Sequence, residues 1–300
     1  MLTTYKYHIF LMLAVLFWSG NFVVGRFISG VVSPIELSFY RWFFVLVVLM
    51  PYYFIHFKRL NYYIKKYFFK ILFLGVLSIT FFNTFVYFGL QTTTATNALL
   101  INSSTPILII LLSSLILKKH LNKIEILGVV ISTLGVLYVI LKGNFNEILN
   151  LSITSGDLWI LIAAFDWALY SVLLKFKPQE IKPFDFLFLI TFFGVFFLSI
   201  LFYGNRYEIT SEVYENKDLL YTLIYIVIFP SILSIYFWNT GTIEIGANKA
   251  GQYANLMPIF GSIVAYFYLD EKIYTYHFVG LFLVLLGIYL TQIYKKKKKN

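Results

Sequence analysis

One acidic side chain, Asp166, interrupts the apolar run "AAFDWALYSVLLK" near its middle. An ionised carboxylate at the centre of a bilayer costs about 2.5 to 3.5 kcal/mol on insertion scales, and helix packing alone does not require one. Asp166 either carries a coupling proton or attracts a substrate ammonium group, or it forms a structural hydrogen bond to a neighbouring helix. We favour a functional role because the residue that corresponds to Asp166 in the internal repeat described below is Phe17.

Polar side chains also recur every three or four residues in other apolar runs, which places each set on one helix face. Two such sets are Thr80, Asn83, Tyr87 and Gln91, and Asn248, Gln252 and Asn255. A single amide can serve as packing glue worth about 0.6 kcal/mol, so we interpret only the group as the lining of a cavity. The candidate substrate-binding residues are Trp18, Asn21, Asn83, Tyr87, Asn97, Asn102, Asp166, Trp167, Tyr170, Trp238, Asn239, Gln252, Tyr253 and Asn255.

The sequence contains no pattern typical of catalysis or of a resident metal. It has no cysteine, and its four histidines are too scattered for a metal site. It has neither a Walker-type phosphate loop nor a Ser/His/Asp arrangement. We therefore expect neither an enzyme nor a protein driven directly by ATP, and no cofactor.

The elements that carry these residues belong in a membrane. The chain is 60% hydrophobic and 21% aromatic but only 13% charged. It therefore has too few polar groups to cover the surface of a water-soluble globule. Its apolar runs have about the 20 residues that a helix needs to cross a bilayer. The net charge of +10 comes from residues in short connections and in the tail, which indicates membrane topology and not a nucleic-acid partner.

We expect an all-α integral membrane protein with ten transmembrane helices. The predicted spans are 8–28, 34–56, 68–89, 95–117, 123–142, 156–175, 184–204, 218–241, 248–269 and 273–294. The connections on the N-terminal side hold most of the lysines and arginines, including Lys58, Lys118 and the tail "KKKKK". The positive-inside rule therefore predicts that both termini are cytoplasmic, in a multi-pass protein of the inner (cytoplasmic) membrane.

The chain also repeats internally. At an offset of 149 residues "FWSGNFVVGRF" aligns with "DWALYSVLLKF", and at an offset of 152 Pro106 aligns with Pro258. Two five-helix halves, 5–142 and 156–294, are followed by a basic cytoplasmic tail, 295–300. Because five is odd, the two halves have opposite orientations, which is typical of secondary transporters whose site lies where the halves meet.

Two stretches that carry these motifs resemble the EamA family of the drug/metabolite transporter superfamily. They are "LFWSGNFVVGRFISGVVSPIELSFYRWFFVLVVLMP" and "IEIGANKAGQYANLMPIFGSIVAYFYLDEKIYTYHFVGLFLVLLGIYL". The resemblance extends over essentially the whole chain. It implies ten helices, a central cavity lined mainly by helices one, three, four, six, eight and nine, and transport of small metabolites, often amino acids and commonly outward. Asp166 departs from the family pattern, in which a small or apolar residue is usual.

Further residues are expected to have structural or mechanical roles. Arg41 could hold a substrate carboxylate or pair with Glu36, and we favour a structural role because it is typical of the family and its helix is usually peripheral. Pro106 and Pro258 are expected in helix interiors, where each bends its helix as a gating hinge or as a static kink. Glycines of helices five and ten are expected to permit close helix contact, with a homodimer interface as the alternative place for that contact.

The sequence thus predicts a secondary transporter of small metabolites, with amino acids or related zwitterions as cargo. We expect alternating access in the export direction, by a monomer or a homodimer in the lipid bilayer. Two alternatives remain open: uptake or exchange of a nucleotide-like metabolite such as S-adenosylmethionine, and a scaffold or receptor that transports nothing.

Overall fold

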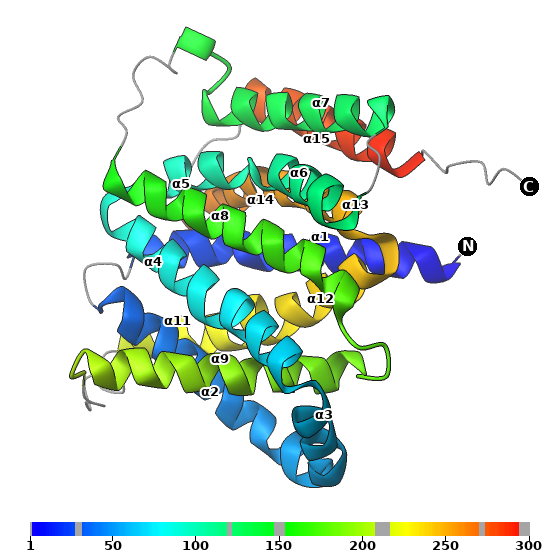
Figure 1. Ribbon diagram of the computed structural model, residues 1–300. Coiled ribbons are helices and arrows are strands. Elements are labelled where there is room, and N and C mark those ends of the chain that lie inside the picture. Colours follow the sequence, from blue (N-terminus) through cyan, green and yellow to red (C-terminus); the bar gives the residue numbers. More distant parts are fainter. Residues whose placement is uncertain are drawn as a thin grey trace, which may run out of the picture.

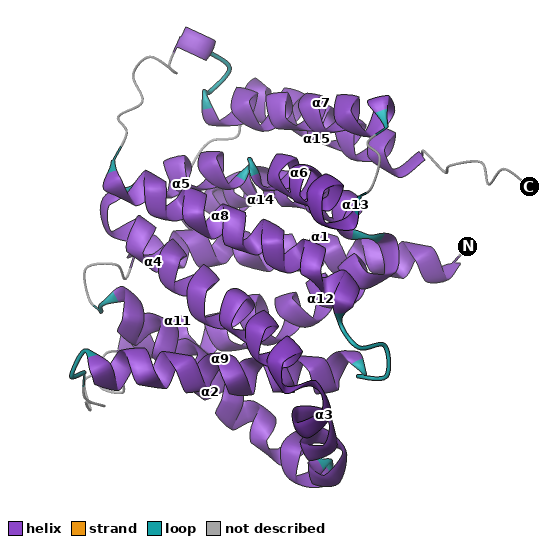
Figure 2. Ribbon diagram, in the orientation of Figure 1, coloured by secondary structure: helices purple, strands orange, loops and turns teal. Residues whose placement is uncertain are grey.

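The described part of the chain is built from helices. A computed structural model describes residues 2–27, 32–118, 122–146, 154–207, 217–269 and 274–293, and these ranges contain no strand (Figures 1 and 2). The main helices are α1 (Leu2–Phe27), α2 (Pro34–Ile55), α3 (Phe57–Gly75), α4 (Phe82–Thr92), α5 (Ala95–Asn102), α6 (Thr105–Leu117), α7 (Lys123–Ile140), α8 (Ser155–Leu173), α9 (Pro183–Gly204), α11 (Lys217–Val227), α12 (Ser234–Ile245), α13 (Ala247–Gly251), α14 (Met257–Leu269) and α15 (Thr275–Ile293). The predicted tail, 295–300, lies outside the described residues.

Several of these helices suit a membrane. Among the described residues, seven helical segments are long and apolar enough to cross one: Pro34–Ile55, Phe57–Thr92, Asn97–Leu117, Lys123–Ile140, Ser155–Phe176, Pro183–Gly204 and Leu220–Ile245. Large apolar side chains face outward, and Ile55, Phe69 and Leu115 are 78%, 81% and 75% exposed. Such a surface suits contact with lipid chains, because extensive exposed apolar patches are rare on proteins that remain in water. The chain therefore has an all-helical, multi-pass membrane fold.

The region between the second and third predicted spans differs from the prediction. We expected a loop before residue 68, but α3 begins at Phe57, directly after the C-cap residue His56. The segment "FKRLNYYIKK" places apolar and basic residues at helical spacing. This amphipathic pattern is missed by a search for continuous apolar runs.

The two prolines expected in helix interiors lie instead in the first turns of helices. Pro106 is the second residue of α6, which follows a turn at residues 103–104. Pro258 is the second residue of α14, which follows the 3-10 stretch Gln252–Leu256. The first turn of a helix does not use its N–H groups in intrahelical bonds. The prolines therefore start new helices after a break, and neither bends a continuous helix.

α7 and α15, which correspond in the predicted repeat, lie side by side at one edge of the bundle (Figure 1). Gly128 packs against Gly287, and Gly135 packs against Gly280, so the two helices run antiparallel. A Cβ atom on Gly128 would lie only 2.7 Å from the backbone oxygen of Gly287. These glycines therefore permit close approach of two helices within one chain, as small residues do in membranes.

α2 and α9, which also correspond in the repeat, run antiparallel as well. Tyr52 in α2 bonds to Asp185 in α9, while Phe39 stacks on Phe202 with ring centroids 4.2 Å apart. The contacts of the central helices also match between the halves. α1 packs on α12 and α14, while its counterpart α8 packs on α4 and α6, the counterparts of α12 and α14. The start of α1 and the end of α15 lie on the same side of the bundle (Figure 1).

Each half contains a π-helical turn of six residues in the same place. Val76–Phe81 joins α3 to α4, and Ile228–Leu233 joins α11 to α12 exactly one repeat offset later. A π turn breaks the regular hydrogen-bond pattern of an α-helix, and such turns are frequent at functional sites. The first turn packs against α8 and α9, and the second packs against α1 and α2.

Candidate functional site: a closed hollow between the two halves

A small hollow lies between helices of the first and second halves. Its volume is about 20 Å³, which is room for about one water molecule. The predicted binding residues that line it are Trp18, Asn21, Asn83, Asn102 and Trp167, and Arg41 also lines it. The hollow is too small for an amino acid, so this conformation is closed around the candidate site.

Three tryptophans from three helices meet beside the hollow. The ring centroid of Trp18 lies 5.0 Å from that of Trp167 and 5.2 Å from that of Trp238, and the last two are 5.8 Å apart. Trp18 Nε1 donates to the backbone oxygen of Pro230 at 2.9 Å, and Trp238 Nε1 donates to Ser171 Oγ at 3.1 Å. The indole N–H groups of Trp18 and Trp238 thus both have acceptors, and the three rings form a well-packed junction of α1, α8 and α12.

Arg41 is almost completely buried, with 1% of its surface exposed. Its Nε donates to Ser231 Oγ at 2.6 Å, and its Nη2 donates to the backbone oxygen of Pro230 at 3.1 Å. Its Nη1 donates to Asn21 Oδ1 at 3.1 Å and to the Tyr87 hydroxyl at 2.9 Å. The π turn that contains Pro230 and Ser231 thus holds the guanidinium at the hollow through uncharged acceptors.

The predicted pair between Arg41 and Glu36 does not form. Glu36 Oε2 accepts the backbone N–H of Ser33 at 3.1 Å, and Ser33 Oγ accepts the backbone N–H of Glu36 at 3.2 Å. This capping box starts α2 and uses the carboxylate there. Neither ion pair found in the described part of the chain involves Arg41. A buried guanidinium without a carboxylate partner favours an anionic ligand, because burial of an uncompensated charge is costly.

Four of the predicted residues form two matching hydrogen bonds. The Tyr87 hydroxyl donates to Asn21 Oδ1 at 3.2 Å, and the Tyr170 hydroxyl donates to Asn239 Oδ1 at 2.8 Å. In the repeat, Tyr170 corresponds to Asn21 and Asn239 corresponds to Tyr87. Each pair therefore joins the first and third helix of its own half, with the tyrosine and the asparagine exchanged. Of the four residues, only Asn21 lines the hollow.

Asp166 is buried but lies outside the set of residues that line the hollow. Its neighbour Trp167 faces the tryptophan cluster, and successive residues of an α-helix point about 100° apart. The Oδ2 atom of Asp166 has no hydrogen-bond partner in the described part of the chain. Among the described residues, this atom therefore does not form the hydrogen bond to a neighbouring helix that was the structural alternative. Asp166 also does not line the closed hollow.

The predicted polar stripe of the third span does not form one continuous face. Thr80 Oγ1 donates to the backbone oxygen of Gly194 in α9 at 3.0 Å, whereas Asn83 lines the hollow. Gln91 is exposed near the end of α4. The π turn Val76–Phe81 precedes Asn83 and changes the residue spacing, so the period of 3.6 that predicted the stripe does not apply across it.

The remaining predicted residues mostly hold helices together. Gln252 Oε1 accepts from Ser132 Oγ at 3.0 Å, and Asn255 Nδ2 donates to Ser132 Oγ at 2.8 Å, which ties the 3-10 stretch to α7. The Tyr253 hydroxyl lies 2.6 Å from His8 Nδ1. Asn97 is half-buried in the first turn of α5 and does not line the hollow. For Gln252 and Asn255, contact with α7 is the packing role that the sequence left as an alternative.

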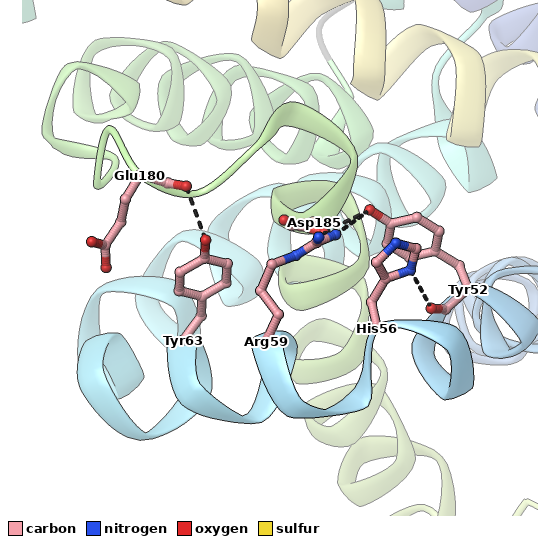
Figure 3. A network of polar contacts seen from close by, with 6 residues as sticks. All are labelled: Tyr52, His56, Arg59, Tyr63, Glu180 and Asp185. Carbon is pink, nitrogen blue, oxygen red and sulfur yellow. Dashed lines mark hydrogen bonds and ion pairs between the residues drawn. The ribbon is translucent and has the colours of Figure 1, made fainter.

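A second polar cluster, which the sequence analysis did not identify, ties α2 and α3 to α9 (Figure 3). Asp185 is fully buried, and its Oδ1 accepts from the Tyr52 hydroxyl at 2.6 Å and from Arg59 Nη2 at 2.8 Å. The Tyr63 hydroxyl donates to the backbone oxygen of Glu180 at 3.0 Å. In the repeat, Asp185 corresponds to Glu36, the capping acid of α2, so the sequence held a signal for Asp185. No pattern in the sequence indicated that Arg59 would meet Asp185.

The same cluster continues onto the exposed surface. Lys66 Nζ lies 3.1 Å from Glu180 Oε1. Hydrogen bonding from Tyr67 and from Lys66 holds the pKa of the Glu180 carboxyl below its usual range. Because both partners are exposed, this pair adds little stability, and the buried Asp185 is the stronger link.

Comparison with known proteins places this architecture. Residues 5–141 and residues 154–293 each match the model of the EamA-like transporter family. The chain belongs to the EamA-like transporter family. The uncharacterized transporter YyaM of Bacillus subtilis (strain 168) is 31% identical over 217 residues, which are 72% of this chain and 70% of that relative. An uncharacterized transporter of Archaeoglobus fulgidus is 26% identical over 292 residues, which are 95% of this chain and 97% of that relative.

A solved crystal structure shares the fold of this EamA-family chain. It has a TM-score of 0.69, with 13% sequence identity, over 95% of this chain and 96% of the other. The names of the EamA relatives describe transporters and not enzymes. With several helices apolar enough to cross a bilayer, this EamA protein is a multi-pass membrane transporter.

Proposed function

We propose that this chain is a secondary transporter that moves amino acids or related zwitterions out of the cell by alternating access. The observation that carries the proposal is the closed hollow lined by residues of both halves, with the buried guanidinium of Arg41 at its wall. A guanidinium recognises a carboxylate through paired, charge-assisted hydrogen bonds. In an open state of the hollow, Arg41 binds the carboxylate of the solute, and Asn21 and the tryptophans surround the rest.

The proposal includes ten membrane-crossing helices in two inverted halves, with both termini in the cytoplasm. The antiparallel packing of α2 on α9 and of α7 on α15 supports it, because corresponding helices of inverted halves have opposite directions. The matching π turns support a common ancestral unit. One unit packed in two orientations has two similar states, which open to opposite sides of the membrane.

Asp166 is proposed as the residue that carries a coupling proton. Its carboxylate is buried one residue from Trp167, which lines the hollow, and its Oδ2 atom has no hydrogen-bond partner within the described ranges. An intramembrane carboxylate of this kind is typical of proton relays in transporters. Attraction of a substrate ammonium group is the second role, and it requires that opening of the hollow brings the carboxylate into contact with the solute.

Flux in proteoliposomes tests the proposed function. Purified protein is reconstituted, and movement of each radiolabelled amino acid is followed with and without a pH gradient, beside protein-free vesicles. We expect flux of at least one amino acid that depends on the protein and responds to the gradient. Labelled S-adenosylmethionine is measured in parallel, and its flux in place of amino-acid flux overturns the assigned cargo. Absence of flux for every solute favours a scaffold or receptor.

A further inference from the structure

A second cavity, much larger than the hollow, opens at the ends of α6, α8 and α12. Its volume is about 760 Å³. The loop 177–182, teal in Figure 2, forms part of its wall and lies on the same side of the bundle as the start of α1. We call this space the inner vestibule. It has the size of a small-molecule site, whereas the hollow is closed.

The charged side chains of the inner vestibule are mostly basic. Lys175, Lys177 and Lys182 line it, and among the described residues Glu244 is its one acidic lining residue. Lys177 Nζ donates to the backbone oxygens of Pro178 and Ile181, and burial lowers the pKa of its ammonium group. Lys175 and Lys182 are exposed. A cleft lined by charge of one sign concentrates ions of the opposite sign, so the vestibule favours anions.

The deeper wall of the inner vestibule carries polar groups that lack partners. Ser113, Thr242 and Asn248 are 1%, 3% and 5% exposed and line the cavity. Within the described ranges, neither hydroxyl nor either polar atom of the Asn248 amide has a hydrogen-bond partner. Buried polar groups without partners are rare in native proteins. The three residues line the cavity, but these polar atoms are themselves covered in this conformation. Turned toward the cavity, two hydroxyls and an amide N–H₂ supply the donors that a carboxylate needs.

The inner vestibule and the hollow meet through one tryptophan. Ser171 lines the vestibule and accepts the hydrogen bond of Trp238 Nε1. On its other side, the ring of Trp238 contacts Trp18 and Trp167, which line the hollow. Trp238 itself is fully buried. Trp238 therefore lies between the two spaces.

We propose that the inner vestibule binds the carboxylate of small solutes as a station before or after the hollow. Lys175 and Lys182 draw the anion in, Ser113, Thr242 and Asn248 bond to it, and Trp238 separates it from Arg41. The assignment of this station to transport rests on the function proposed above. The preference of the vestibule for anions does not rest on that function.

The absence of cysteine from the chain permits a direct test, because one introduced thiol is then unique. Thr242→Cys is treated with an anionic (sulfonate) or a cationic (trimethylammonium) methanethiosulfonate reagent of similar size. We expect the anionic reagent to react faster by about tenfold, as for a steered encounter, and the preference to fall when Lys175→Gln and Lys182→Gln are added. Thr92→Cys, exposed at the end of α4, is the matched control and should show no such preference.

Ligand protection tests the binding itself. Acetate should slow the reaction of the thiol in Thr242→Cys, its neutral analogue acetamide should not, and Asn248→Leu should remove the protection. Equal rates for the two reagents, or equal effects of acetate and acetamide, overturn the proposal. An anionic lipid headgroup has the same chemistry, so the assay is run in phosphatidylcholine vesicles with and without phosphatidylglycerol. Protection by phosphatidylglycerol but not by acetate also overturns the assignment to a solute.

The outcome is independent of the transport assay. A protein that binds acetate in the inner vestibule but moves no amino acid keeps the site and loses the proposed function. A protein that moves amino acids while the introduced thiol shows no preference between reagents keeps the function and loses the station.

Discussion

Each of two buried charged residues, Asp166 and Arg41, has an uncharged counterpart in the other half, although much else is repeated. Asp166 corresponds to Phe17, and Arg41 corresponds to Ile190. A charge that the common fold requires should be present in both halves. Arg41 lines the closed hollow and Asp166 does not, although the sequence favoured a structural role for Arg41 and a functional role for Asp166. We interpret Arg41 as the residue that contacts the solute and Asp166 as the residue that responds to protons.

Removal of the Asp166 charge should uncouple transport from pH. In Asp166→Asn, we expect flux that no longer changes with a pH gradient, because the amide cannot take up or release a proton. The unfolding temperature should not fall, because Asp166 Oδ2 has no hydrogen-bond partner to lose among the described residues. Paired flux and thermal-unfolding measurements check both statements. Normal gradient dependence in a folded variant contradicts the coupling role.

Removal of the Arg41 charge should abolish recognition of the carboxylate. Arg41→Gln should lose the thermal stabilisation that a transported amino acid gives, because a ligand that binds the folded state raises its stability. Arg41→Lys keeps the charge without the planar fork and should retain part of the effect. The uncharged amide of the same amino acid is the control ligand, and it should stabilise neither variant nor the parent. Undiminished stabilisation of Arg41→Gln would refute the role.

At the scale of elements, the two π turns explain why helical periodicity predicted the site only in part. An insertion of one residue rotates the following helix face by about 100°. Thr80, within the turn Val76–Phe81, and Asn83, after it, therefore face different neighbours: Thr80 contacts α9 while Asn83 lines the hollow. The carbonyl oxygen of Pro230, in the second turn, accepts hydrogen bonds from Trp18 and Arg41. The turns thus supply backbone groups to the site.

The close pair α7 and α15 should tolerate no added methyl group. In Gly128→Ala the new Cβ would lie 2.7 Å from the Gly287 oxygen, so we expect the free energy of unfolding to fall by about 1 to 3 kcal/mol. The matched control is Gly261→Ala in α14, where the new Cβ would meet only Leu99 Cδ1 at 3.7 Å. Thermal unfolding in detergent compares the two variants. Equal unfolding temperatures would contradict the close packing described here.

At the scale of the whole molecule, links between the halves lie at both the centre and one side. Arg41 and Trp18 of the first half bond to the π turn of the second half at the hollow. Asp185 of the second half bonds to Tyr52 and Arg59 of the first half nearer the side where α1 begins. The inner vestibule opens on that same side. This arrangement suits a conformation in which the solute path is open up to Trp238 and closed beyond it.

The proposed inverted topology predicts opposite labelling of two exposed loop positions. In intact cells, a membrane-impermeant thiol reagent should label Asn205→Cys, after α9, but not Gln179→Cys, before α9. Permeabilised cells should show labelling of both. Asn61→Cys, at the start of α3, should behave like Gln179→Cys. Labelling of all three positions from outside would overturn the proposed orientation.

The sequence by itself determined the membrane class, the internal repeat and the family. Each depends on the order of residues along the chain: apolar runs match the thickness of a bilayer, and aligned tryptophans and prolines mark two related units. It also predicted as binding residues Trp18, Asn21, Asn83, Asn102 and Trp167, which line the closed hollow, and their role in binding stays a prediction.

The tertiary structure alone decided which of the polar residues meet. Gln252 and Asn255 bond to Ser132 in α7, while Arg41 bonds to a π turn 190 residues away along the chain. The direction of a side chain depends on helix rotation, and the π turns and the 3-10 stretch change that rotation without a clear signal in the sequence. Contacts between distant helices follow from that geometry, so they could not be predicted from residue spacing.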